Sequence, residues 1–268
     1  MSTVIRDNLR ILRCAFVSAF ADMRATYTWR TWTFAWLVRI LCQVTLFAFI
    51  GKLIGNPATT EYLVVGNSVF ITADIVMMVC ATTSWERMAG TLPLLIGAPA
   101  SPFVVFAGRS VQWLVDGLAC STVSLMLLAP VLGVHLPFSA VLLAVPMVAL
   151  ISLSVYAFGL VLAGLALRVM SARNIIGRLG SILLMVLTGV QVPVDFWPAP
   201  LRVVAQFLPL THGLEAVRTV LHGGSGGTVL KGLGLEIAVG FGWSLVAVYT
   251  YWRLVASGRK DGSIEFGG

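Results

Sequence analysis

Residues 62–102 read YLVVGNSVFITADIVMMVCATTS followed by WERMAGTLPLLIGAPASP, and the boundary between these two pieces decides the fold. The first piece, residues 62–84, is an apolar run as long as the roughly 20 residues that a helix needs to cross a bilayer. The second piece, residues 85–102, begins with polar residues and ends in Pro-rich sequence, but it keeps apolar residues in its middle. The boundary therefore predicts a transmembrane helix that leads out of the bilayer into an amphipathic connecting segment.

The chain as a whole is too apolar for a soluble domain. Of its 268 residues, 58% are hydrophobic and 11% are charged, whereas a soluble domain carries about 25% charged residues. Six apolar runs are long enough to span a bilayer: 31–54, 62–84, 103–133, 138–167, 174–194 and 229–252. We therefore expect an all-α integral membrane protein with six transmembrane helices, in which residues 1–268 form a single transmembrane domain.

The basic residues predict the orientation of these helices. With six spans, most Lys and Arg residues fall on one side of the membrane: Arg6, Arg10, Arg13, Arg24, Arg30, Arg87, Arg109, Arg168, Arg173, Arg178, Arg253, Arg259 and Lys260. The opposite side has only Lys52, Arg202, Arg218 and Lys231. The positive-inside rule then places both termini and residues 85–102 in the cytosol, in a multi-pass protein of the inner (plasma) membrane. Because these charges mark the membrane boundary, no basic face is left for nucleic acid.

Two further segments lie outside the spans. Residues 1–30 have apolar residues at three- and four-residue steps beside arginines, which predicts an amphipathic helix at the cytosolic membrane surface. A short signal peptide is the alternative interpretation. Residues 195–228 are predicted to form an external segment, because prolines interrupt any single long helix. This segment is expected to contain two short helices, 201–208 and 211–221, the second of which is capped by Thr211.

No motif for a bound cofactor or metal is present. The sequence GGSGGTVLKG, residues 223–232, lacks the Gly-Lys-Ser/Thr ending of a P-loop. The four cysteines contain no CxxC pair, and the three histidines have no metal-ligand spacing. We therefore expect no catalytic residue, cofactor or metal on this chain.

Charged residues occur well within the first three predicted spans. They are Arg39, Asp74 and Asp116. An unpaired charge in a bilayer costs several kcal/mol, so each is expected to face protein or water. Arg39 and Asp74 lie at similar depth, which predicts an ion pair between them. This pair is either structural or part of a translocation or proton-coupling site.

Residues 85–102 resemble the cytosolic loop of type-2 ABC transporter permeases, the family that contains daunorubicin-type drug exporters and polysaccharide and lipo-oligosaccharide exporters. Members carry a Glu-Arg…Gly-Thr-Leu segment, then a short apolar stretch and a Pro-Ser-type turn. The matching residues here are Glu86, Arg87, Gly90, Thr91, Leu92, Leu94, Leu95 and Pro99. Pro93 departs from the more usual polar residue after Gly-Thr-Leu.

A second resemblance to the same family covers residues 187–218. The family has a proline after span five, a short helix, a Leu-Pro-Leu-Thr segment and a helix with an acid and an arginine. The matching residues are Pro193, Leu208, Pro209, Leu210, Thr211, Glu215 and Arg218. By this resemblance Pro193, Pro209, Glu215 and Arg218 belong to an external gate segment.

The resemblance implies a permease subunit that moves an amphipathic or lipid-like substrate out of the cytosol or the inner leaflet. ATP and Mg²⁺ are then bound by a separate cytosolic ABC ATPase, present in two copies. The permease itself is expected to pair with a second permease copy, as a homodimer or a heterodimer, and to contact membrane lipid. The loop 85–102 is the expected coupling element, in which Leu92, Leu94 and Leu95 bury an apolar face and Glu86 and Arg87 orient it.

Two other classes remain as alternatives. An ion-coupled secondary transporter would use Asp74 or Asp116 and would work without an ATPase, but the internal repeat typical of many such transporters is not evident. A membrane enzyme acting on lipids would need a polar catalytic cluster near one interface, and the sequence offers none.

Overall fold

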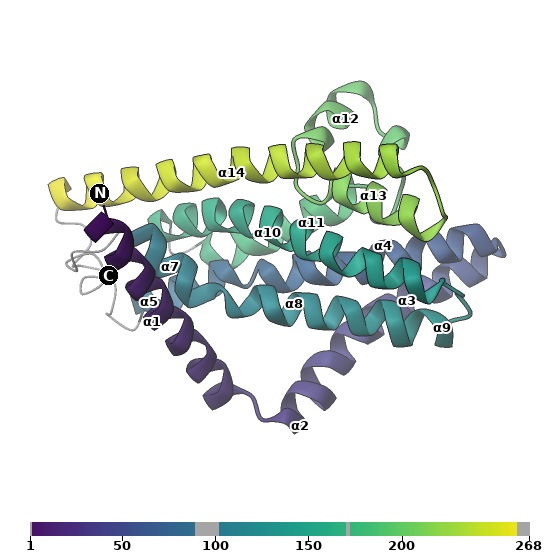
Figure 1. Ribbon diagram of the computed structural model, residues 1–268, viewed down its shortest axis with the longest axis horizontal. Helices are drawn as coiled ribbons and strands as arrows, with labels where there is room; N and C mark the ends of the chain where they lie inside the picture. Colours follow the sequence, from purple (N-terminus) through teal and green to yellow (C-terminus); the bar gives the residue numbers. More distant parts are fainter. Residues whose placement is uncertain (1, 89–101, 170–171, 262–268) are drawn as a thin grey trace.

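The protein is an elongated bundle of helices (Figure 1). The computed structural model describes residues 2–88, 102–169 and 172–261, and in these residues it contains no β-strand. The first half of the chain forms α1 (Ser2–Thr26), α2 (Trp29–Thr31), η1 (Trp32–Leu37), α3 (Val38–Ile54), α4 (Pro57–Val76), α5 (Val79–Met88), α7 (Pro102–Ser110), α8 (Gln112–Val123), η2 (Ser124–Leu128) and α9 (Ala129–Val131). The second half forms α10 (Phe138–Arg168), α11 (Arg173–Leu187), η4 (Val194–Phe196), α12 (Ala199–Gln206), α13 (Thr211–Leu221) and α14 (Gly226–Asp261). The segments η1 and η2 are π-helical turns within longer helices.

Five continuous helices of the described part are long and apolar enough to cross a membrane. They are Trp29–Ile54, Pro57–Thr83, Phe103–Val131, Phe138–Arg168 and Gly226–Leu254. Each coincides with one of the six runs expected from the sequence. The remaining run, 174–194, contains only a shorter apolar helix, Ile175–Leu187. The all-helical membrane fold is therefore confirmed, whereas the sixth full-length span is not.

The helix α11 ends early for a local reason. After Leu187 the chain bends, and Gly189 takes a φ of +85°, the left-handed conformation in which helices commonly end. Pro193 then begins the 3₁₀ turn η4 as its N-cap. At about 1.5 Å per residue, the 15 residues of α11 cover roughly 22 Å, less than the hydrocarbon core of a bilayer.

The centre of the bundle is α10. It packs against α14, α13, α11, α5, α4 and α8. The interior is apolar, with Phe70 of α4, Ile151 and Val155 of α10 and Leu214 of α13 buried in one cluster. In α4 nearly all residues from Leu63 to Val76 are buried, so this helix lies inside the bundle. Residues 63–76 therefore supply an interior wall against which functional side chains are held.

Four chain segments meet at one end of the bundle. The start of α1, the end of α5, the start of α7 and the end of α14 lie together there (Figure 1). The N-terminal helix α1 packs along α7, and Arg109 of α7 donates to the carboxylate of Asp22 in α1 at 3.1 Å. The segment 89–101, which joins α5 to α7, therefore starts and finishes at the end where α1 and α14 also lie.

The short helices α12 and α13 occupy the chain between α11 and α14. The predicted N-cap of α13 was wrong: the Thr211 hydroxyl donates instead to the carbonyl of Ala205 at 2.6 Å. The N-cap position belongs to Leu210, which has a φ of +85° and offers no side-chain cap. The N–H groups at the start of α13, which lack a partner within the helix, therefore need another acceptor, and a different helix provides it.

Candidate functional site

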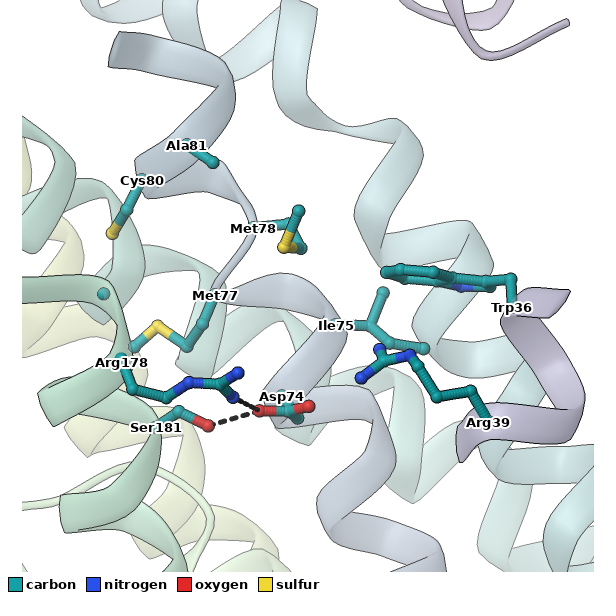
Figure 2. A pocket seen from close by; sticks show the side chains of 11 residues that line it. Trp36, Arg39, Asp74, Ile75, Met77, Met78, Cys80, Ala81, Arg178 and Ser181 are labelled. Carbon is teal, nitrogen blue, oxygen red and sulfur yellow. Dashed lines mark hydrogen bonds and ion pairs between the residues drawn. The ribbon is translucent and has the colours of Figure 1, made fainter. Parts of the chain in front are cut away.

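A cavity of about 360 Å³ lies between α3, α4, α5 and α11. Its charged and polar walls come from Arg39, Asp74, Arg178 and Ser181, and its apolar walls come mainly from Trp36, Ile75, Met77 and Met78. Figure 2 shows Arg39 and Arg178 reaching toward Asp74 from opposite sides, with the methionines above them. Three helices, α3, α4 and α11, thus bring two cations and one anion to the same space.

Asp74 is held by α11. Its Oδ1 accepts a hydrogen bond from the Ser181 hydroxyl at 2.5 Å and lies 3.8 Å from Nη1 of Arg178. The Asp74 side chain is 18% exposed, whereas that of Arg178 is 68% exposed. Arg178 and Ser181 are functional candidates that the sequence did not single out. One signal was available, because an acid within a span requires a partner and Arg178 lies near the predicted cytosolic start of the apolar run 174–194.

The expected pair between Arg39 and Asp74 is absent. No ion pair within 4.0 Å joins these two residues, both of which the structure describes. The Arg39 guanidinium instead lies over the ring of Trp36, 4.8 Å from its centroid. Similar depth along two helices placed both residues on one cavity, but the direction of each side chain around its helix decided the partner.

Asp116 of α8 joins that helix to the start of the first span. Its two carboxylate oxygens accept hydrogen bonds from the indole N–H groups of Trp32, at 2.6 Å, and Trp36, at 2.8 Å. The π-helical turn η1 carries both tryptophans, and Asp116 is only 6% exposed. Asp116 therefore fixes the orientation of Trp36, the ring on which Arg39 rests.

Arg218 anchors α13 to α4 and to the chain after α11. Its guanidinium donates to the carbonyl of Gly189 at 2.9 Å and to the carbonyl of Tyr62 at 3.1 Å. It also lies 3.5 Å from the centroid of the Tyr62 ring, and the Tyr62 hydroxyl donates to the same Gly189 carbonyl at 2.6 Å. Burial lowers the pKa of Arg218, with Tyr62 and Glu215 opposing the shift. An arginine stays charged at neutral pH, so this is a cationic anchor.

The close approach of these elements requires a glycine in α4. A Cβ on Gly66 would overlap the carbonyl oxygen of Val190 and the guanidinium of Arg218. Of the other predicted gate residues, Pro193 begins η4, Pro209 lies between α12 and α13, and Glu215 is an exposed residue of α13. The structure brings Arg218 to the exit of α11 but leaves Glu215 on the surface.

Glu236 of α14 caps α13. Its Oε1 accepts the backbone N–H of Leu210 and its Oε2 accepts that of Gly213, each at 2.9 Å. Glu236 is completely buried. The sequence analysis missed this residue, although an acid within the apolar run 229–252 deserved the same notice as Asp74. A carboxylate at a helix N-terminus satisfies free N–H groups and interacts favourably with the helix dipole.

The predicted coupling residues are only partly covered by the structure. Glu86 and Arg87 fall in the last turn of α5, and Gly90, Thr91, Leu92, Leu94 and Leu95 lie outside the described residues. Trp85, which immediately precedes them on α5, is 54% exposed. Within the ranges that the structure describes, no group of three or more His, Cys, Asp or Glu residues could hold a metal ion. The site is therefore a charged cavity and two anchored helices.

Comparison with known proteins agrees with this arrangement. A family model described as ABC-2 type transporter matches residues 19–222, which is more than half of the chain. The matched region extends from α1 to the end of α13 and includes the charged cavity. No curated protein matches the chain.

Proposed function

The chain belongs to the ABC-2 type transporter family, and from this premise we propose that it is the permease subunit of an ATP-driven exporter. The family is a membrane transport component, and the helices of this chain are those of a multi-pass membrane protein. The single observation that carries the proposal is the family match across 19–222. The substrate is an amphipathic or lipid-like molecule that leaves the cytosol or the inner leaflet.

In this proposal the energy for transport comes from another protein chain. ATP and Mg²⁺ are bound by a cytosolic ABC ATPase, two copies of which serve two permease copies, identical or different. A permease of this kind needs an element that leaves the bilayer and binds the ATPase. Residues 85–102 suit this role because their apolar residues, Leu92, Leu94 and Leu95, lie in sequence between two apolar runs that are long enough to span a bilayer. The exposed Trp85 at the end of α5 adds apolar surface beside them.

The placement of the helices supports one orientation. The ends of α5 and α14 and the starts of α1 and α7 lie at one end of the bundle (Figure 1). That end is the cytosolic side if the basic residues follow the positive-inside rule. The contact between Asp22 and Arg109 then lets α1 brace α7 next to the coupling segment. The opposite side carries α12 and α13, and the membrane is the inner (plasma) membrane.

The alternative of an ion-coupled transporter gains no support. Both oxygens of Asp116 accept indole N–H groups, and Asp74 is engaged by Ser181 and Arg178. Each acid therefore already has partners that hold the carboxylate in place. The family match also favours the ATP-driven class.

The coupling element is tested by two substitutions in residues 85–102. Leu95→Asp puts a charge into a contact that must be dry, which costs several kcal/mol when the charge is unpaired. Glu86→Ala removes one polar anchor and costs about 2–5 kcal/mol if its partner is left buried. We expect Leu95→Asp to abolish, and Glu86→Ala to reduce, co-purification with the ATPase or substrate-stimulated ATP hydrolysis. The measurement is transport and ATPase activity of the reconstituted complex beside the co-purification ratio.

The matched control lies on the opposite side. Ser225 accepts the backbone N–H of Thr228 at the start of α14, a role that an aspartate also performs. Ser225→Asp therefore adds a charge while the helix start is kept, and it should leave ATPase binding unchanged. If Leu95→Asp and Glu86→Ala both assemble and transport like the unmodified protein, residues 85–102 are a passive connection and the proposal loses its physical basis.

A further inference from the structure

The cavity between α3, α4 and α11 carries an unbalanced positive charge. Its charged walls are two arginines, Arg39 and Arg178, and one carboxylate, Asp74. Asp74 is 3.8 Å from Arg178, so these two charges offset each other. No carboxylate of the described part of the chain lies within 4.0 Å of Arg39. The cavity therefore holds one cation without a matching anion.

The unmatched positive charge of the cavity lies on helices that are apolar enough to be in the membrane. Arg39 belongs to the span Trp29–Ile54, and Arg178 to the shorter apolar helix Ile175–Leu187. Ten residues separate Trp29 from Arg39, which is about 15 Å along a helix. Charged residues at such depth face the bundle interior or a water-filled cavity and pair with other groups. The ring of Trp36 gives Arg39 a cation–π contact, but it does not cancel its charge.

The other walls of the cavity are apolar and adaptable. Ile75, Met77, Met78 and the Trp36 ring line it. Methionine side chains are flexible and polarisable, so they accommodate hydrocarbon of varied shape. The Trp36 side chain is held in one orientation, because Asp116 accepts a hydrogen bond from its indole N–H at 2.8 Å. The cavity therefore combines the Arg39 guanidinium, which rests on the Trp36 ring, with the flexible apolar side chains of Met77 and Met78.

From this geometry we infer that the cavity binds an amphiphile with an anionic head group, which Arg39 and Arg178 contact while the tail lies against Met77 and Met78. Guanidinium groups bind phosphate and carboxylate through paired, charge-assisted hydrogen bonds. Asp74 keeps Arg178 beside the cavity, and Asp116 keeps Trp36 in place as a positioning residue. This inference names the substrate class of the exporter and rests on that proposed function.

The test measures binding without ATP and without the ATPase, so its failure is distinct from failure of the proposed function. The purified full chain is placed in phosphatidylcholine nanodiscs and titrated calorimetrically with dodecyl phosphate, with protein-free nanodiscs subtracted. We expect saturable binding that Arg39→Gln weakens by about tenfold or more, the effect of losing one strong charge-assisted contact. Arg39→Lys should recover part of the affinity, because it keeps the charge but loses the planar fork.

Three comparisons make the result decisive. Inorganic phosphate tests a free anion, and dodecyltrimethylammonium tests the tail with the opposite charge. Arg202→Gln removes an arginine on α12 that does not line the cavity, and this variant should bind dodecyl phosphate like the unmodified protein. Circular dichroism and gel filtration establish that Arg39→Gln and Arg39→Lys are folded. The inference is overturned if folded Arg39→Gln binds dodecyl phosphate unchanged, if dodecyltrimethylammonium binds as tightly, or if inorganic phosphate binds as tightly as dodecyl phosphate.

Discussion

Glu236 shows how one buried acid positions a helix that lies elsewhere in the sequence. Both of its oxygens accept backbone N–H groups at the start of α13, from Leu210 and Gly213. A carboxylate offers both oxygens as acceptors, whereas a protonated carboxyl turns one of them into a donor. The residue is fully buried, so water cannot replace these contacts. Glu236 therefore fixes the start of α13 through both of its oxygens.

Replacing this carboxylate by its amide should destabilise the protein. In Glu236→Gln one of the two N–H groups faces an NH₂ donor, and both charge-assisted bonds are lost. A hydrogen bond to a charged group contributes about 1.5–3 kcal/mol, so we expect a loss of roughly 2 kcal/mol or more. Thermal and denaturant unfolding of the detergent-solubilised protein measure it. The exposed Glu215→Gln on α13 is the control and should change stability by no more than about 0.5 kcal/mol. Equal stability of the two variants would contradict the capping role.

For single residues, the sequence was a better guide to the important side chains than to the partners of those side chains. Arg39, Asp74 and Asp116 stand out because charge within an apolar run is costly, and all three have specific contacts. The pair Arg39–Asp74 was wrong because depth along a helix says nothing about rotation around it. Glu236 was missed although it is an acid within an apolar run as Asp74 is, and its partners are backbone groups, which no sequence pattern marks.

A single arginine attaches α13 to α4 and to the chain after α11. Arg218 spans the carbonyls of Gly189 and Tyr62 and stacks on the Tyr62 ring. A lysine offers a point charge in place of the planar fork, so it cannot reproduce both contacts and the stacking. The attachment of α13 to α4 and to the end of α11 therefore depends on the shape of this side chain as well as its charge.

Arg218→Lys should loosen α13 while the rest of the bundle keeps its structure. Loss of one buried contact costs about 1–2 kcal/mol, which corresponds to roughly tenfold lower amide protection. Hydrogen exchange read by mass spectrometry should show this loss in residues 211–221, with α10 unchanged as the internal reference. Arg202→Lys, on the more exposed arginine of α12, should leave both helices protected as before. Unchanged exchange in α13 of Arg218→Lys would show that other contacts hold the helix.

Elements were predictable where composition alone defines them. Five of the six apolar runs are helices long enough to span a membrane, because such length is visible in hydropathy. The helix predicted for residues 174–194 was too long because the last residues of this run are apolar but do not continue α11. Gly189 turns the chain, and Val190 is buried against α4. Apolar character indicates burial, and only local geometry distinguishes a buried turn from a helix.

At the scale of the whole molecule, the orientation in the membrane is the main prediction. With six crossings, thirteen basic residues lie on the side of the termini and four on the opposite side. A cysteine at Ser225, placed in a background without Cys14, Cys42, Cys80 and Cys120, should react with an impermeant maleimide added to intact cells. The side chain of Ser225 is exposed in the turn before α14, so access is not limited by burial. A cysteine at Thr3 serves as the internal control and should react only after permeabilisation. Labelling of Ser225→Cys from the cytosolic side alone would contradict the orientation.

The continuity of α14 has a consequence for how its two ends relate to each other. Near its start, Glu236 is buried against α13, and near its end, Tyr251 is buried against Phe106 of α7, with ring centroids 5.4 Å apart. Fifteen residues separate these two contacts in one unbroken helix. Each residue advances a helix by about 1.5 Å and turns it by about 100°. The number of residues between the contacts thus sets their relative angle, so a residue cannot be added to or deleted from this part of α14 without turning a carboxylate or a phenol out of its place.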